Sequence, residues 1–244
     1  MDTQLQLKTK FKVSSADTDM FARLKISALA NYLIQAAIES AESLGFGLSH
    51  LRKDHLFWVL NRLTIEVYHH PKWNDTIEVE TWPKSIERIF FMRDFIVRDK
   101  NNRIIAKANS AWLAIDLESK RPSTFSADKA KYFTKLKELY ALDYSPLKLD
   151  ASDGQAIKTI APTYFDIDLN KHVTSTRYID WMMDHFSFEH HKNNYPKHLS
   201  INFLKETMLS DELLLCHKDI SNEHYFEGLN KQQNKPAFRG KIIF

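Results

Sequence analysis

The first long pattern in the chain is a helical one. Apolar residues recur at intervals of three and four from Ile26 to Leu44, which is the spacing of a buried helix face. Glu39 and Glu42 are the only charged residues in this stretch. A helix with so few charges must be enclosed on most sides, so the sequence predicts that other elements wrap around it. Gly45 predicts where the helix ends.

Stretches of alternating apolar and polar residues follow this helix. They cover residues 63–68, 77–82, 89–98 and 104–117, and short polar turns join them. Long alternating strands with short connections indicate an antiparallel sheet. An enclosed helix followed by such a sheet predicts an α+β unit in which the sheet curls around the helix.

The same order of patterns returns in the second half of the chain. A polar loop and an apolar helical pattern occupy residues 165–186, and strand candidates follow at 198–203, 212–219, 224–228 and 238–244. The string Asp166-x-Asp168-Leu169 matches Asp17-x-Asp19-Met20 at an offset of 149 residues (168 − 19). We therefore predict two copies of one helix-plus-sheet unit, residues 1–145 and 146–244.

The segment between the copies, residues 118–161, has the composition of a linker. Residues 120–148 hold seven basic and three acidic side chains, a local net charge of +4. A short helix is expected over Ser126–Tyr140. Its charged face is as consistent with simple solvation as with a docking surface for an acidic partner.

The loop of the second copy differs from that of the first in its polar residues. Asp168, Asn170 and His172 lie within five residues at the start of the predicted helix, whereas the first copy has Phe21 and Arg23 in place of the last two. Free N–H groups and the positive end of the helix dipole would stabilise a carbonyl oxygen that gains negative charge there. The same string could equally cap the helix. Its absence from the first copy favours one working site, in the second copy.

Glu206 lies at the end of the strand that follows the second predicted helix, and its counterpart in the first copy lies near His70. A lone Glu at a strand end is most often an exposed carboxylate without a function. The functional alternative is that Glu206 faces the loop of Asn170 and His172 and acts as a general base on water.

The composition excludes several classes of function. Five glycines without a GxGxxG or P-loop string argue against a nucleotide-binding enzyme, and a net charge of +3 gives no bulk attraction for nucleic acid. The histidines at 69–70 and 185–191 lack ligand spacing with carboxylate or cysteine partners, so the sequence predicts neither a metal nor an organic cofactor. With one cysteine, no apolar signal region and no stretch long enough to span a bilayer, we expect a cytoplasmic protein without a membrane span.

Several short strings occur together in a combination that is more specific than any one of them. They are Trp58-x-Leu60, Tyr68-x-x-Pro71-Lys72-Trp73-x-Asp75, Val79-Glu80-Thr81-Trp82, Arg88 with Arg93-Asp94, Ala108–Trp112, Asp168-Leu169-Asn170-x-His172-Val173 and Tyr178-x-x-Trp181. Along nearly its whole length the chain thereby resembles the acyl-acyl-carrier-protein thioesterases of the bacterial and plant type.

This resemblance implies a tandem double hotdog fold, in which each hotdog is a long helix wrapped by an antiparallel β-sheet. It also implies hydrolysis of the thioester of acyl-acyl-carrier protein, with the acyl chain held mainly by the first hotdog and the chemistry placed in the second. The catalytic set of the family maps onto Asp168, Asn170, His172 and Glu206. The reaction would release a free fatty acid and end fatty-acid elongation.

One position departs from the plant members of the family. They carry a cysteine directly after the catalytic Glu, whereas this chain has Thr207 there and its Cys216 lies farther along. A cysteine nucleophile is therefore missing at the site, and attack by a water molecule fits the sequence better.

The resemblance also indicates a partner, an acidic acyl-carrier protein that bears an acyl-phosphopantetheine. The sequence leaves open whether the chain forms a homodimer. Two other classes of function stay open as well. One is another hotdog enzyme, an acyl-CoA thioesterase or a dehydratase, and the other is a non-catalytic acyl-chain binding protein.

Overall fold

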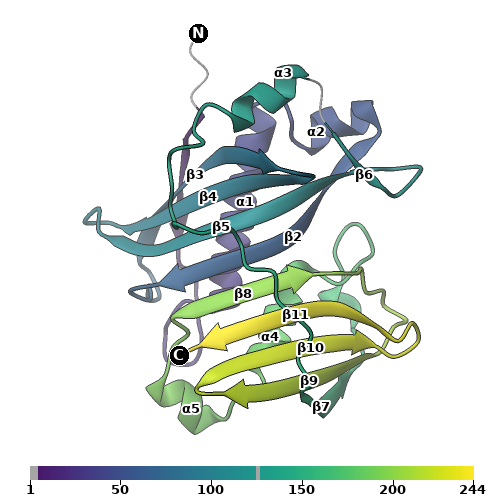
Figure 1. Cartoon of the computed structure of the whole chain (residues 1–244). Coiled ribbons are helices and arrows are strands. Elements are labelled where there is room, and N and C mark those ends of the chain that lie inside the picture. Colours follow the sequence, from purple (N-terminus) through teal and green to yellow (C-terminus); the bar gives the residue numbers. More distant parts are fainter. Residues whose placement is uncertain (1–4, 125–126) are drawn as a thin grey trace. The chain divides into compact units, whose positions relative to one another are not determined.

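Residues 5–124 and 127–244 are described by the computed structural model (Figure 1). The chain divides into two units between Pro146 and Leu147, where the sequence analysis places the division after residue 145. Each unit combines an antiparallel sheet with one main helix, so the fold is an α+β tandem double hotdog.

The first unit contains a sheet in the order β1-β3-β4-β5-β2, with β6 paired to β5, and every pair of neighbours in it is antiparallel. Its strands are β1 (Leu7–Lys12), β2 (Leu56–Val67), β3 (Thr76–Glu87), β4 (Phe90–Asp99), β5 (Ile104–Asp116) and β6 (Pro122–Ser123). Its helices are α1 (Ile26–Ser43), α2 (Leu48–Leu51) and α3 (Ala127–Ala130), with 3-10 turns at Arg52–Asp54 and Lys131–Phe133.

Helix α1 lies against one face of this sheet (Figure 1). Leu29, Leu33 and Ala36 are fully buried there, and burial of each leucine side chain stabilises the fold by about 1.5–3 kcal/mol. The chain leaves the helix at Gly45, as predicted, with a φ of 78°. Glycine adopts this left-handed conformation without steric penalty, which makes it the usual residue after a helix.

The second unit contains a sheet in the order β8-β11-β10-β9-β7, again antiparallel throughout. Its strands are β7 (Gln155–Ile160), β8 (His198–Phe203), β9 (Leu213–Ile220), β10 (Glu223–Asn230) and β11 (Lys235–Ile243). Its helices are α4 (Ser175–Met183) and α5 (Phe188–Asn193), with a 3-10 turn at Tyr164–Asp166.

Helix α4 has only nine residues, so it is half as long as α1. It packs closely on β11, because a Cβ atom at Gly240 would come within 2.2 Å of the Met182 sulfur. Glycine at this position therefore allows the helix and the strand to approach each other. None of the described helices is both long and apolar enough to cross a membrane.

The expectations for the region between the copies are wrong in two respects. Residues 118–161 are not simply a linker, because they contain β6 and β7. The helix expected over Ser126–Tyr140 is only α3 and the short 3-10 turn that follows it; Ser126 lies outside the described residues.

Contacts with the sheet of the first unit hold the far end of the expected helix in a non-helical conformation. The Trp82 indole N–H donates to the Leu139 carbonyl oxygen at 3.3 Å. The Ala141 backbone N–H donates to the buried Asp94 carboxylate at 2.8 Å. These bonds fix the backbone of residues 139–141 to the sheet, so it does not continue a helical ladder.

Candidate active site

The loop before α4 is shaped by the Asp168 carboxylate. Its Oδ1 accepts hydrogen bonds from the backbone N–H groups of Asn170 (2.8 Å) and His172 (3.1 Å). The Asp168 N–H in turn donates to the His172 carbonyl oxygen at 2.8 Å. Lys171, between them, has a φ of 67°. Asp168 therefore fixes the backbone on which Asn170 and His172 stand, and its contact with Asn170 is through that backbone.

A second carboxylate ties the loop to the helix. Asp166 is buried and accepts hydrogen bonds from Thr163 and from the Arg177 Nε, the latter at 2.6 Å. Burial acts to raise the pKa of Asp166, but the hydrogen bonds from Thr163 and Arg177 outweigh it and lower that pKa. The Thr174 N–H also donates to the Asp166 carbonyl oxygen. The start of α4 is therefore held rigidly next to the loop.

The segment after β8 lies directly against this loop. The Val173 N–H donates to the Thr207 carbonyl oxygen at 2.8 Å, and His172 and Met208 form an isolated antiparallel β-bridge. This pairing brings the Glu206 side chain to the loop, with its Oε2 3.3 Å from the His172 Nε2. The structure thus brings together two side chains that the sequence could only suggest were neighbours.

The side chains of this group are accessible to a substrate. Glu206 is half exposed and His172 is partly buried. Asn170 is exposed, and its side-chain amide makes no hydrogen bond to any residue that the structure describes. A carboxylate next to an imidazole, with a free amide nearby, can take a proton from water and donate hydrogen bonds to an oxygen.

The first unit repeats this backbone arrangement closely. The Asp19 carboxylate accepts from the backbone N–H groups of Phe21 and Arg23, both at 2.9 Å. The Leu24 N–H donates to the Pro71 carbonyl oxygen, as Val173 does to Thr207. A bridge between Arg23 and Lys72 matches the one between His172 and Met208.

This correspondence makes His70 the counterpart of Glu206. In the first unit the position of His172 is taken by Arg23, whose guanidinium pairs with the Asp19 carboxylate at 2.8 Å. The Asp therefore has the same structural role in both copies. This role is to fix the loop and not to cap α4, whose N-cap residue is Thr174. The side chains of Asn170, His172 and Glu206 have no part in it, so helix capping does not explain the set.

The surroundings of the cysteine do not favour a role as nucleophile. Cys216 is buried on β9, and burial raises the pKa of its thiol. A buried thiol with a raised pKa is a poor nucleophile. Thr207, which directly follows Glu206, is fully buried.

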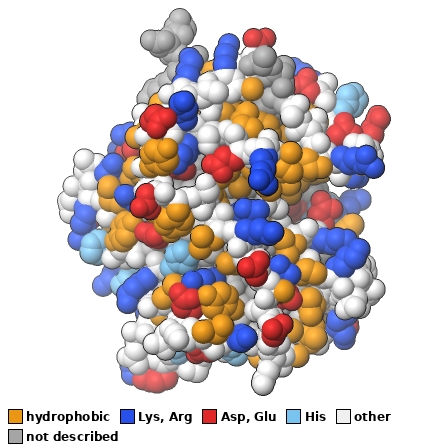
Figure 2. Space-filling view, viewed as in Figure 1, with side chains coloured by type: hydrophobic (Ala, Val, Ile, Leu, Met, Phe, Trp, Pro, Cys, Tyr) orange, Lys and Arg blue, Asp and Glu red, His pale blue; other side chains and the backbone are white. Residues whose placement is uncertain are grey.

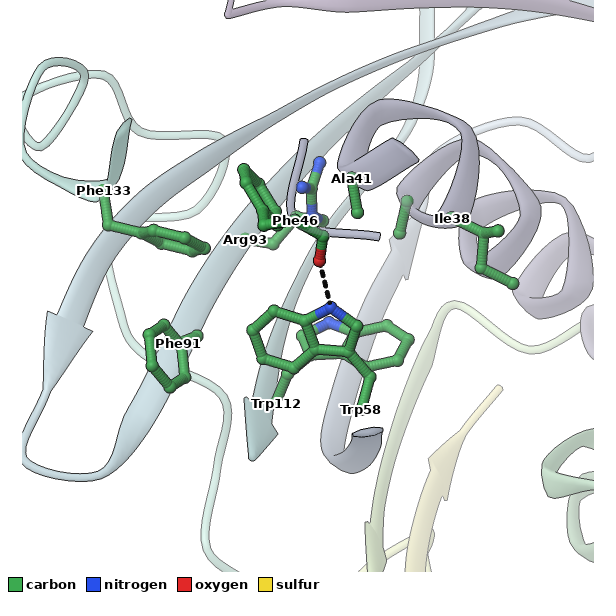
Figure 3. Close-up of a pocket in the computed structure, with 9 residues that line it drawn as sticks. Ile38, Ala41, Phe46, Trp58, Phe91, Arg93, Trp112 and Phe133 are labelled. Carbon is green, nitrogen blue, oxygen red and sulfur yellow. Dashed lines mark hydrogen bonds between the residues drawn. The ribbon is translucent and has the colours of Figure 1, made fainter. Parts of the chain in front are cut away.

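The first unit contains a partly open apolar cavity of about 50 Å³ (Figure 3). Its lining residues are Ala37, Ile38, Ala41, Phe46, Trp58, Phe91, Arg93, Trp112 and Phe133. The Trp58 indole N–H donates to the Phe46 carbonyl oxygen at 2.9 Å, which fixes one ring of the wall. A cavity lined mainly by aromatic and aliphatic side chains is suited to an alkyl group.

Arg93 is the charged residue in this wall. The pattern of apolar and polar residues did not predict that its side chain would lie in a cavity wall. It is almost completely buried, and its Nη1 donates to the hydroxyls of Ser40 (3.0 Å) and Thr81 (3.2 Å). Burial lowers the pKa of Arg93 to about 9. Among the described residues no carboxylate forms an ion pair with it.

Histidines of the second unit form a packed cluster with aromatic rings. Its members are His185, Phe186, His190, His217, His224, Phe226 and Phe244. The His217 Nε2 lies 3.2 Å from the His224 Nδ1. Burial, with the neighbouring His185 and His224, lowers the pKa of His217 to about 4. In the described part of the chain, no group of three or more His, Cys, Asp or Glu residues is arranged to hold a metal ion.

Comparison with protein families gives two adjacent matches. The model of the acyl-ACP thioesterase N-terminal domain matches residues 4–133, and the model of the C-terminal domain matches residues 149–243. Among curated proteins, the chloroplastic oleoyl-acyl carrier protein thioesterase of Coriandrum sativum is 27% identical over 232 residues, which are 88% of this chain and 60% of that protein. Oleoyl-acyl carrier protein thioesterase 2 of Arabidopsis thaliana is 27% identical over 86% of this chain and 62% of its own length. The chain thus spans about 60% of the length of these plant relatives.

Solved structures give a match over the full length. An acyl-ACP thioesterase from Bacteroides thetaiotaomicron superposes with a TM-score of 0.91 and 28% identity, covering 98% of this chain and 97% of its own. The 12:0-ACP thioesterase from Umbellularia californica superposes with a TM-score of 0.80 at 22% identity, with 98% and 97% coverage. The second likeness is evidence of fold alone.

Proposed function

The chain belongs to the acyl-ACP thioesterase family, and on that premise we propose that it hydrolyses the thioester of acyl-acyl-carrier protein, releasing a free fatty acid and ending elongation. The observation that carries this proposal is the contact between His172 and Glu206, because the first unit builds the same loops with Arg23 and His70 in their places. The relatives named above support the substrate class by their own names.

Water is the nucleophile in the proposed reaction. Glu206 takes a proton from a water molecule, whose oxygen forms a bond to the thioester carbonyl carbon. The carbonyl oxygen gains negative charge in the tetrahedral intermediate. The carbon–sulfur bond then breaks, and the phosphopantetheine thiolate leaves and takes back the proton from Glu206. The products are the fatty acid and the free thiol of the carrier protein.

Three residues position the reactants around this step. The exposed Asn170 amide donates a hydrogen bond to the developing oxyanion. His172, in contact with Glu206, orients the carboxylate and the water. Asp168 acts one step away, by holding the backbone of Asn170 and His172. A buried thiol such as Cys216 has no step in this scheme.

The cavity of the first unit is the proposed binding place of the acyl chain. Trp58, Trp112 and three phenylalanines contribute to its wall. Binding of an alkyl chain removes apolar surface of both the wall and the chain from water, which is favourable in free energy. The first unit would then select the acyl chain, and the second would carry out the chemistry.

A panel of substrates tests the proposal. Thiol release is measured in parallel from acyl-acyl-carrier protein, from the acyl-CoA of the same chain length and from a hydroxyacyl thioester. Loss of water is measured on the hydroxyacyl thioester as well. We expect the highest kcat/KM with the carrier-protein substrate and no dehydration. A preference for acyl-CoA, or loss of water from the hydroxyacyl substrate, would favour another hotdog enzyme. Binding without thiol release would identify an acyl-chain binding protein.

A further inference from the structure

Large apolar side chains surround the candidate active site on the outside of the protein. Phe165, Leu169 and Tyr164 are 87%, 81% and 80% exposed, and Met208 and Leu209 are exposed as well. We call these five residues the apolar rim. An exposed group of this size on a soluble protein usually marks an interaction site.

The members of the rim lie together because the loops that carry them are bonded to each other. The rings of Tyr164 and Phe165 are 5.3 Å apart. Leu169 lies in the turn closed by Asp168, and that loop is paired with the segment that carries Met208 and Leu209 through the His172–Met208 bridge. The loops that carry the rim are therefore fixed to one another by their backbones.

Two lysines are sequence neighbours of the candidate catalytic residues. Lys171 lies between Asn170 and His172, and Lys205 directly precedes Glu206. Both are exposed. Neither forms an ion pair with a residue that the structure describes, so their charges are available to an acidic partner.

The equivalent loops of the first unit provide a comparison within the same chain. Met20 and Trp73 occupy the positions of Leu169 and Leu209, and both are exposed. The positions of Lys171 and Lys205 are taken by Ala22 and His69. Apolar loop tips are thus common to both copies, whereas this pair of lysines belongs to the copy with the candidate active site.

We propose that the apolar rim, with Lys171 and Lys205, is the docking surface for the acidic acyl-carrier protein. This inference rests on the proposed function. It places the partner where the thioester on its phosphopantetheine arm comes within reach of Glu206. The rim supplies apolar contact area, and the two lysines supply attraction to acidic side chains.

A second copy of this chain fits the same surface less well. A two-fold symmetric contact would use the same patch on both subunits. It would bring the lysines of both copies to one interface, where like charges repel. Lys and Arg side chains are interspersed with Asp and Glu side chains on the face drawn in Figure 2.

The basic segment 120–148 is the other surface that an acidic partner could use. Part of its charge is already engaged within the chain. Lys129 pairs with Asp54, and Lys137 lies 3.9 Å from the Glu138 carboxylate. Substitution of its lysines therefore tests it as the alternative docking surface in the same experiment.

The test compares kcat/KM for acyl-acyl-carrier protein with kcat/KM for the acyl-CoA of the same chain length. The ratio of the two cancels any effect of a substitution on the chemistry at Glu206. The first variant is Lys171→Gln with Lys205→Gln, and the second is Phe165→Ser with Leu209→Ser. The matched control is Met20→Ser with Trp73→Ser, which removes the apolar tips of the first unit.

We expect the lysine variant to lower the ratio by about tenfold, since charged docking surfaces raise association rates by 10-fold or more. The variant with Phe165→Ser and Leu209→Ser should lower it by about tenfold or more, because it removes apolar area that docking would bury. The control should leave the ratio within about twofold. In the lysine variant the ratio should also lose most of its salt dependence, because exposed charges are screened beyond about 10 Å at 0.1 M salt.

Three results would overturn the docking proposal. The first is an unchanged ratio in both the lysine variant and the apolar variant. The second is an equal fall of the ratio in the control. The third is a fall of the ratio in the variant Lys131→Glu with Lys135→Glu that the lysine and apolar variants do not show. The last result would place docking on the basic segment. Failure of the unaltered protein to hydrolyse either substrate is a different outcome, and it would reject the proposed function itself.

Discussion

The Nε2 of His172 lies 3.3 Å from the Oε2 of Glu206, and the two side chains come from separate segments joined by backbone hydrogen bonds. This contact makes Glu206 the expected general base. Glu206→Ala should lower kcat by about 10²–10⁴-fold, the usual contribution of such a group. Because its side chain is half exposed, the free energy of unfolding should change by less than about 0.5 kcal/mol.

Steady-state kinetics and urea unfolding of the same preparation check this prediction. Glu206→Gln keeps the size of the side chain and removes its basicity, so it should be as slow as Glu206→Ala. Turnover close to that of the unaltered protein in either variant would remove Glu206 from the mechanism.

Asp168 and Asp19 offer a matched pair of substitutions. Each carboxylate accepts two backbone N–H groups in its own loop, so Asp168→Ala and Asp19→Ala should each reduce stability by about 1 kcal/mol or more, the usual net contribution of a hydrogen bond to a charged group. Asp168→Ala should also lower kcat, because the backbone of Asn170 and His172 is no longer fixed.

The comparison of kcat between these two variants decides the role of Asp168. We expect Asp19→Ala to retain the kcat of the unaltered protein. Equal values of kcat in both variants, at equal loss of stability, would mean that Asp168 only stabilises the fold.

Cysteine chemistry should make no contribution to turnover. Cys216 is buried and burial raises the pKa of its thiol, so little of the reactive thiolate is present at neutral pH. Cys216→Ser should retain full kcat, and iodoacetamide should not inhibit the native protein. An acyl group found on Cys216 by mass spectrometry would contradict attack by water.

Much of the fold follows from local patterns, and the exceptions have physical reasons. Helix α1 and the long strands of the first unit bury enough residues that their apolar positions repeat at helical or strand spacing in the sequence. Strand β7 does not, because five of its six residues are exposed at the edge of the sheet. The sequence QAIKTI therefore lacks a clear buried face.

The candidate site was predictable only in part. The internal repeat identified Asp168, Asn170 and His172 as an unusual loop, since the first copy has different residues there. That the Glu206 side chain reaches His172 depends on the bridge to Met208, which no local pattern encodes. Arg93 in the wall of the apolar cavity was likewise invisible, because a charged residue on a strand normally indicates an exposed position.

The size of the first unit's cavity should determine which acyl chains are accepted. Ala41 lies on α1 and lines that cavity, so Ala41→Phe would fill part of it. We expect kcat/KM for a long acyl chain to fall by tenfold or more, about the effect of losing one or two buried methylenes. Substrates short enough to avoid the filled part should keep their kcat/KM, which controls for damage to the fold. An equal fall for long and short chains would argue against this cavity as the acyl site.

The histidine cluster predicts how stability depends on pH. The pKa of His217 in the folded protein is lowered to about 4, from an ordinary value near 6.5, chiefly by burial and then by His185 and His224. The carboxylate of Asp219 acts in the opposite direction. As the pH falls from about 6.5 to about 4, the unfolded chain takes up a proton at His217 while the folded chain does not. Stability must therefore fall across this window, and below it His217 makes no further contribution to the slope.

His217→Gln should flatten this dependence, since glutamine does not titrate. Urea unfolding midpoints at pH 7 and pH 5 measure the effect, and His69→Gln, outside the cluster, serves as the control. Burial also lowers the pKa values of His185 and His190, so part of the slope should persist in the His217 variant. If His217→Gln and the control lose the same stability between the two pH values, proton uptake at His217 is not what makes the second unit sensitive to acid.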